Sequence, residues 1–319
     1  MVWLSVFEEL KQHIERGKVS FSLISILFVL FVIAFFTGFS YLCYTFMYLI
    51  SYLVLSASWY LLYSYSGQLS LGHALPFGVG AFSLMIFLSR LNFHPIIALI
   101  LAPLVAAAVG GTVGLTTIRL RPAYQGIALL IASQVAFWIS LLQVGEEGIS
   151  LGVQILAGGH IYGIILLISL ICMLSIFFVE NSKIGLKLKA IKEDGLASQS
   201  LGINVTYYKI LIFFASSFFA GLGGTSFALY TSHADYTIFS IPNSFLPIAM
   251  VVVGGSGELT GCILGSVIIS ILMRYLPIKI GLPWTYIIYG FLVVLVLKIY
   301  PAGLLGAIKR ALTKKPEGG

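Results

Sequence analysis

Uncharged polar side chains, rather than ionisable ones, are the main candidates for chemistry in this sequence. Gln68, Ser70 and His73 stand close together in a long apolar stretch, and Gln134 lies in another. Their amide, hydroxyl and imidazole groups can hydrogen-bond a small solute, or they can satisfy backbone groups freed where a helix breaks. Both interpretations stay open for these four residues. Ser70 could also cap the helix that follows the break.

Sequence motifs for catalysis or metal binding are absent. His73 has no second histidine or cysteine at metal-ligand spacing. The chain has no H-E-x-x-H, no G-x-S-x-G, and no pair of carboxylates within an apolar segment. It also lacks G-x-x-x-x-G-K-[ST], the loop that cradles nucleotide phosphates. We therefore expect no catalytic residue, no metal site and no cofactor bound by this chain.

The elements that position these polar residues must lie in lipid. Of the 319 residues, 59% are apolar and 9% are charged, and the mean hydropathy is +1.05. A soluble globular protein carries about 25% charged residues. No Asp, Glu, Lys or Arg occurs in residues 19–89, enough for about three spans of roughly 20 residues each. The segments should be helices, because backbone groups in hydrocarbon must be satisfied internally.

We expect an all-α polytopic membrane protein, one transmembrane domain over residues 1–319 with about ten transmembrane helices. The eighth and ninth spans are short, and Gly254, Gly255, Gly257 and Gly261 interrupt the pair, so the two could form a hairpin that only partly crosses. Small residues four apart, as in Ala220 and Gly224, predict close helix packing. The expected spans are residues 21–40, 42–63, 72–90, 95–118, 123–143, 162–180, 209–231, 243–256, 261–274 and 284–300.

Basic residues predict the orientation, since they collect in short cytoplasmic loops. With ten spans, 14 of the 18 Lys and Arg residues fall on the side of both termini. That side should be cytoplasmic, and the net charge of +7 then requires no nucleic-acid partner. The fourteen are Lys11, Arg16, Lys18, Arg119, Arg121, Lys183, Lys187, Lys189, Lys192, Lys209, Lys309, Arg310, Lys314 and Lys315. The opposite side should hold Arg90, Arg274 and Lys279, with Glu146, Glu147 and Asp235.

Three segments lie outside the spans. Residues 1–20 form a charged amphipathic lead-in, and the apolar run after it is too long for a signal-peptide core, so it should remain as the first span. Residues 301–319 form a basic tail. Between them, residues 181–208 predict two short helices, with Ile184, Leu188 and Ile191 at helical spacing and a break at Gly195. This loop either docks on a partner or only enforces topology through its lysines.

Four stretches, in this order, resemble one family. They are GQLSLGHALPFGVGA at 67–81, RLRPAYQGIALLIASQ at 119–134, GLKLKAIKEDGLASQSLGINV at 185–205, and the segment 216–265 with SSFFAGLGG and VVVGGSGELTGCILG. The chain is similar over about residues 40–300 to LivM-like permease subunits of ABC importers for branched-chain amino acids. The resemblance implies a multi-pass protein of a prokaryotic cell membrane that imports such solutes.

The resemblance also implies partners. In that family the permease pairs with a second, LivH-like permease, two ABC ATPase subunits attach on the cytoplasmic face, and an extracellular binding protein delivers the solute. ATP and Mg²⁺ would be bound by the ATPase subunits. The residues that match the family's ATPase-docking segment are Gly185, Lys189, Ala190, Lys192, Glu193, Asp194, Ala197, Leu201, Gly202, Ile203 and Asn204.

Two acidic features depart from the family's pattern. Glu146 and Glu147 stand where relatives often have a GGSDG-like run, and they are candidates for contact with the binding protein. Glu258 replaces a small apolar residue in the late glycine loop, as a hydrated acid or as part of an inner gate. Candidates for the translocation path or a helix break are Gln68, Ser70, His73, Gln134, Gly254, Gly255, Gly257 and Glu258.

Other functions compete with import of branched-chain amino acids. The same permease fold could carry urea, short amides or another small polar solute. An ion-coupled secondary transporter would need ionisable residues within its spans, and the expected span interiors are almost uncharged. An enzyme within the membrane is disfavoured by the absent motifs.

Overall fold

The computed structural model describes residues 40–151, 158–300 and 303–307. The expected lead-in, the first expected span and most of the basic tail lie outside this part. The described helices are α2 (Ser40–Ser66), α3 (Ala74–Ser89), α4 (Pro95–Thr117), α5 (Pro122–Val144), α6 (Gly158–Glu180), α7 (Lys183–Glu193), α8 (Gly195–Ser200), α9 (Val205–Thr231), α10 (Ile241–Gly254), α11 (Leu259–Ile280) and α12 (Leu282–Ile299), with the 3₁₀ turn η1 (Tyr236–Phe239).

Six described helices, α2, α4, α5, α6, α9 and α11, are long and apolar enough to cross a bilayer. α3 and α10 have 16 and 14 residues, so they extend only about 24 and 21 Å, less than the ~30 Å of hydrocarbon. Both are largely buried in protein, which allows their ends to be irregular at membrane depth. The chain is a multi-pass membrane protein, as expected.

Three expected helix boundaries need correction, those of α11, α9 and α3. α11 runs to Ile280, six residues beyond the expected 274, so Arg274 lies inside a helix and not in a loop. α9 begins at Val205, because Asn204 caps its first turn, and the connecting segment is therefore shorter than 181–208. Ser70 does not cap the next helix; α3 begins at Ala74.

α9 is the central helix of the bundle and packs against α2, α3 and α4. The contacts depend on small residues, as the spacing predicted. A Cβ added at Gly224 would lie 1.8 Å from the Phe77 carbonyl oxygen, and one at Gly80 would lie 2.3 Å from the Gly221 carbonyl oxygen. Helix backbones therefore touch here, and dispersion contact replaces the hydrophobic force that lipid does not supply.

The late glycines join α10 and α11 backbone to backbone. A Cβ at Gly265 would lie 1.8 Å from the Met250 oxygen, and one at Gly254 would lie 1.8 Å from the Gly261 oxygen. Gly255 has φ +119° and turns the chain between the two helices. The helical hairpin is present, but α11 has 22 residues and is apolar enough to cross a bilayer, so the expectation of a short span is wrong for α11.

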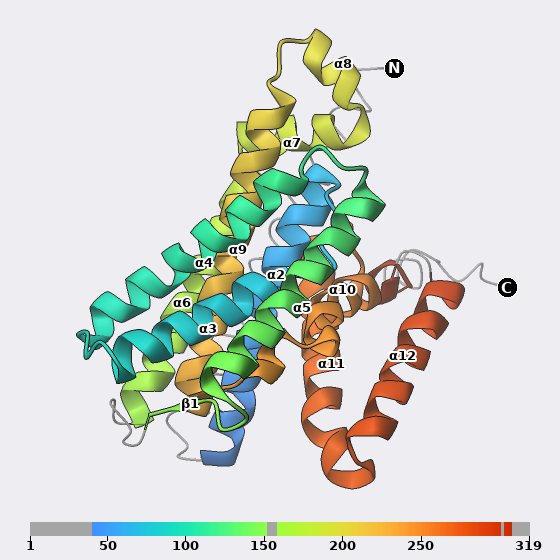
Figure 1. The fold of residues 1–319 in the computed structure, drawn as a ribbon. Helices are drawn as coiled ribbons and strands as arrows, with labels where there is room; N and C mark the ends of the chain where they lie inside the picture. The colour runs from blue at the N-terminus through green and yellow to red at the C-terminus, as the bar shows by residue number, and fades with distance from the viewer. Residues whose placement is uncertain (1–39, 152–157, 301–302, 308–319) are drawn as a thin grey trace, which may run out of the picture.

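The bundle has two opposite ends (Figure 1). α7 and α8 protrude at one end, the α7–α8 end. At the other end, the β1–β2 end, β1 (Ile149–Ser150) pairs antiparallel with β2 (His233–Ala234). Hydrogen bonds join α7, the end of α2 and the loop between α10 and α11 at the α7–α8 end: Lys192 Nζ donates to Ser64 O at 3.2 Å, and Ser64 Oγ donates to Ser256 O at 2.8 Å.

Candidate functional site

α7 forms because its first turn is capped and one of its faces is apolar. Ser182 is the N-cap, and its side chain accepts a hydrogen bond from Gly185 N at 3.2 Å. Gly185, Leu188 and Ile191 are the buried residues. A Cβ at Gly185 would lie 2.2 Å from the Val179 oxygen, so glycine lets α7 fold back on the end of α6. Of the three expected apolar residues, Leu188 and Ile191 are buried, but Ile184 is exposed.

α8 is a single short turn fixed by Asp194. The Asp194 carboxylate accepts hydrogen bonds from Leu196 N at 2.9 Å and Ala197 N at 3.0 Å. Its negative charge also suits a helix N-terminus. The buried residue of α8 is Ser198, whereas Ala197 is exposed. Asp194 therefore has a structural role in shaping the loop.

The lysines of this loop contact their own chain. Lys192 Nζ lies 5.4 Å from the Tyr63 ring centroid, in addition to its bond to Ser64 O. Lys189 Nζ lies 5.1 Å from the Tyr65 ring centroid. Lys187 Nζ donates to Tyr208 Oη at 2.9 Å. These contacts tie α7 to the end of α2 and the start of α9.

Three leucines project into solvent from the same segment. Leu186, Leu196 and Leu201 are 62%, 78% and 80% exposed, and we call them the leucine tip. Exposed apolar side chains on a polar segment outside the bundle are a common feature of protein contact sites. The family resemblance had pointed to Leu201, but it missed Leu186 and Leu196. These two could have been found in the sequence as leucines that do not fall on the buried face of their helix.

The segment ends with a turn that only glycine adopts easily. Gly202 has φ +79°, and nothing lies within 4 Å of an added Cβ. Ile203 is half-buried, and Asn204 caps α9 by accepting a hydrogen bond from Tyr207 N at 3.0 Å. Ala190 is half-buried, and Glu193 is exposed at the end of α7.

His73 lies at the centre of a buried hydrogen-bond network at the break between α2 and α3. His73 Nε2 lies 2.9 Å from Ser58 Oγ and 3.4 Å from Ser216 Oγ, and its Nδ1 lies 3.3 Å from Ser70 Oγ. Trp59 Nε1 donates to Ser70 O at 2.8 Å. The network joins α2, α3 and α9 and satisfies backbone groups at the break. A place on the translocation path stays a prediction for His73 and Ser70.

The two glutamines at the expected breaks lie apart. Gln68 Nε2 donates to Lys209 O at 3.3 Å at the α7–α8 end, and its Oε1 is buried without a partner among the described residues. Gln134 Nε2 donates to Phe239 O at 3.3 Å beside η1. Both bind backbone carbonyls, and the structure does not bring them into one site.

The glycine loop lies at the α7–α8 end, beside Ser64. Gly257 is exposed, and Glu258 is half-buried at the N-cap of α11. Thr260 Oγ1 donates to Glu258 Oε2 at 3.3 Å. Gly254 and Gly255 serve the close approach of α10 and α11, as the fold shows.

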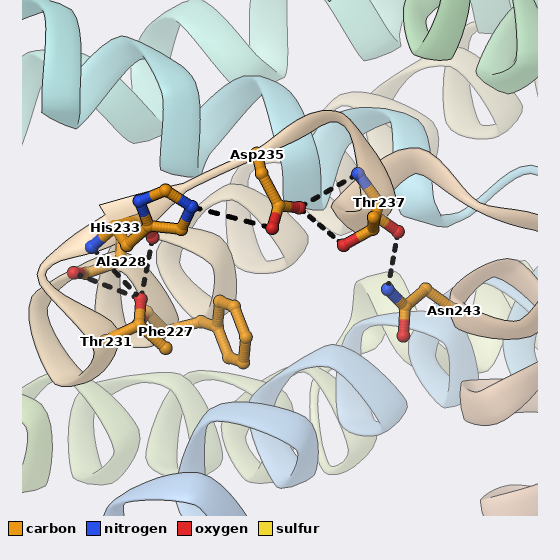
Figure 2. A network of polar contacts seen from close by, with 7 residues as sticks. All are labelled: Phe227, Ala228, Thr231, His233, Asp235, Thr237 and Asn243. Atoms are coloured by element: carbon orange, nitrogen blue, oxygen red, sulfur yellow. Dashed lines mark hydrogen bonds and ion pairs between the residues drawn. The ribbon is translucent and has the colours of Figure 1, made fainter. Parts of the chain in front are cut away.

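A second polar network holds the β1–β2 end (Figure 2). Asp235 pairs with His233 Nε2 at 3.5 Å and accepts hydrogen bonds from the Thr237 backbone at 2.9 Å and from its hydroxyl. Asn243 Nδ2 donates to Thr237 O at 3.0 Å, which links the start of α10 to η1. Glu146 and Glu147 are exposed in the turn before β1, at this same end.

Within the described ranges, no group of three or more His, Cys, Asp or Glu residues could hold a metal ion. Arg274 is an ionisable residue that the sequence interpretation misplaced. It is half-buried in α11, and its guanidinium carbon lies 5.6 Å from the Tyr48 ring centroid. Its signal in the sequence was a single arginine in residues 259–278, which hold no other charged side chain.

Comparison with known proteins agrees with this arrangement. The family model for the branched-chain amino acid transport system permease component matches residues 41–297. No solved structure gives a significant match.

Two bacterial relatives and an archaeal one are named as LivM permeases for branched-chain amino acids. The Salmonella typhimurium protein is 26% identical over 301 residues, covering 83% of this chain and 70% of the relative. The Escherichia coli protein is 25% identical with the same coverage. The Methanocaldococcus jannaschii protein, named as probable, is 27% identical over 233 residues, covering 66% of this chain and 68% of the relative. The family match spans nearly all of the described helices, and the chain therefore belongs to the branched-chain amino acid transport permease family.

Proposed function

We propose that this chain is a permease subunit of an ATP-driven importer in a prokaryotic cell membrane, and that it forms part of the path for branched-chain or related aliphatic amino acids. The loop that contains α7 and α8 is the contact for two ATPase subunits, which bind ATP and Mg²⁺. A related permease completes the membrane unit, and an extracellular binding protein delivers the solute at the β1–β2 end.

The observation that carries this proposal is the leucine tip on a firmly anchored hairpin. Leu196 and Leu201 are exposed, while Lys192 binds the end of α2 and Asn204 caps α9. A docking element must present an apolar surface to its partner and transmit the partner's motion to the spans. Both requirements are met within residues 183–204.

The mechanism follows from these attachments. ATP favours the closed arrangement of the ATPase subunits, and the difference in its binding free energy between two arrangements is available to move the permease. Movement of α7 would act on α2 through Lys192 and on α9 through Asn204. Because α9 packs on α2, α3 and α4, its displacement would tilt several spans together.

Aspartate at two of the three positions of the leucine tip tests the docking role. The double variant Leu196→Asp and Leu201→Asp removes two exposed apolar side chains at no cost to the bundle's own packing. We expect at least about tenfold less ATPase subunit to co-purify in mild detergent, since losing two anchors of an interface typically costs more than 1.4 kcal/mol. Solute uptake should fall in parallel, while the permease still inserts.

The matched control is Leu91→Asp, a 51% exposed leucine in the loop between α3 and α4, away from the α7–α8 end. It introduces the same charge outside the membrane-spanning helices and should leave ATPase recovery unchanged. Wild-type recovery of the ATPase subunits with the double variant would contradict docking at α7 and α8.

A further inference from the structure

Arg274 is a cation within the membrane-spanning part of α11. It lies fifteen residues after Leu259 and six before Ile280, about 22 Å along the helix from the α7–α8 end and about 9 Å from the other end. A charge at such a depth costs several kcal/mol unless it has partners, so it usually marks a function.

Two tyrosines from other helices hold the guanidinium. Its carbon lies 5.6 Å from the ring centroid of Tyr48 in α2 and 5.8 Å from that of Tyr230 in α9. The two rings are 6.3 Å apart, and Tyr48 also contacts Tyr52 at 4.7 Å. We call Arg274, Tyr48 and Tyr230 the arginine cage. Contact with ring faces stabilises the cation, but it leaves the N–H edge of the guanidinium for other partners.

That edge is incompletely used. The Tyr230 hydroxyl interacts with the guanidinium, yet Arg274 Nε is buried with no hydrogen-bond partner in the described part of the chain. Among the described residues, the one ion pair joins His233 and Asp235, and no carboxylate lies within 4 Å of Arg274. The chain has no acid in residues 259–316. Within the described ranges, the guanidinium therefore has donor capacity left over and no carboxylate that neutralises its charge.

The described residues cover the cage only in part, and hydrogen bonds link its surroundings to the β1–β2 end. Arg274, Tyr48 and Tyr230 are all half-buried, which leaves part of each side chain accessible. Tyr52 Oη donates to Asn243 Oδ1 at 3.3 Å, and Asn243 belongs to the network of Figure 2. The tyrosines are thus connected to the loop where a delivered solute would enter.

We propose that Arg274 binds the carboxylate of the transported amino acid in the arginine cage, near the β1–β2 end. This rests on the function proposed above. The planar guanidinium matches a carboxylate with two parallel N–H···O bonds, and the ring faces suit an aliphatic side chain. Urea and short amides carry no anion, so this site selects for the amino acid class of cargo. A lipid phosphate is another anion that the same guanidinium could bind.

The test uses the complete transporter, with its ATPase subunits, partner permease and binding protein, in proteoliposomes. Leucine uptake and ATP hydrolysis stimulated by loaded binding protein are measured for Arg274→Leu and Arg274→Lys. Arg274→Leu should lower uptake at least about tenfold, the effect of losing one charge-assisted hydrogen bond, while ATP hydrolysis stays within about twofold. Arg274→Lys should give an intermediate loss, because it keeps the charge and loses the fork. Lys279→Leu, on the same helix and exposed, should transport normally.

Direct binding separates the possible failures. Saturation-transfer NMR of leucine with the purified transporter, without binding protein, should give a signal for the wild type, a weaker one for Arg274→Lys and none for Arg274→Leu. No wild-type signal, or unchanged uptake by a well-assembled Arg274→Lys variant, would overturn the site. A defect seen in anionic lipid but absent in phosphatidylcholine vesicles would assign the guanidinium to a lipid phosphate and overturn it too. A wild-type transporter that binds leucine without transporting it would contradict the proposed function alone.

Discussion

Single glycines allow helices α10 and α11 to approach each other closely. Gly265 packs on the Met250 carbonyl of α10, and a Cβ there would lie 1.8 Å from that oxygen. The obstacle is backbone, which cannot turn aside as a side chain can. Gly257 is only eight residues away, yet an added Cβ would meet nothing within 4 Å. Substitutions at the two positions therefore distinguish the effect of a steric clash on stability from the effect of restricting the backbone.

We expect Gly265→Ala to lower the free energy of unfolding by about 1–3 kcal/mol, because overpacking forces α10 and α11 apart. Gly257→Ala should change it by less than about 0.5 kcal/mol. Thermal unfolding in detergent measures both. Equal midpoints for the two variants would show that α10 and α11 are not held by this backbone contact.

At the scale of residues, the sequence predicted where a helix breaks, but it did not predict which side chains hydrogen-bond to one another. The stretch containing Gln68, Ser70 and His73 indicated a helix break, which is present. The seryl partners of His73, Ser58 and Ser216, lie 15 and 143 residues away, and no local pattern connects them. Arg274 was misplaced because the length of α11 depends on packing against α10 and α2, which hydropathy does not register.

At the scale of elements, the loop containing α7 and α8 is a rigid connection. Each of its helices has a side-chain cap: Ser182 for α7 and Asp194 for α8. The sequence predicted two short helices and a break near Gly195, because apolar spacing and glycine are local signals. It did not predict which face of α8 is buried, since Ser198 is covered by tertiary contact and Leu201 is not.

Gly202→Ala should weaken this connection. Its φ of +79° strains an L-residue by about 1–2 kcal/mol, although the space around the Cβ is open. We expect lower uptake per ATP hydrolysed, because the turn between α8 and α9 would shift. Gly195→Ala is the control: it has equally open space and no positive φ, so it should couple normally. Full coupling in both variants would argue against force transmission through this turn.

At the scale of the whole molecule, the bundle places two different chemistries at opposite ends. Exposed leucines and lysines lie at the α7–α8 end, and an acidic turn with the arginine cage lies toward the β1–β2 end. The charge pattern predicts that the α7–α8 end faces the cytoplasm, and that orientation stays a prediction. Ten spans with cytoplasmic termini stay a prediction, because residues 1–39 and 308–319 lie outside the described part.

The central claim is that α8 faces the cytoplasm, where ATP is available. Single cysteines at Ser200 in α8 and at Glu147 before β1 can be labelled with a membrane-impermeant thiol reagent, since the native Cys43, Cys172 and Cys262 are buried. The account predicts that Ser200→Cys reacts only in inside-out vesicles and Glu147→Cys only in intact cells. Labelling of Ser200→Cys from outside intact cells would place the leucine tip away from any ATPase and contradict the account.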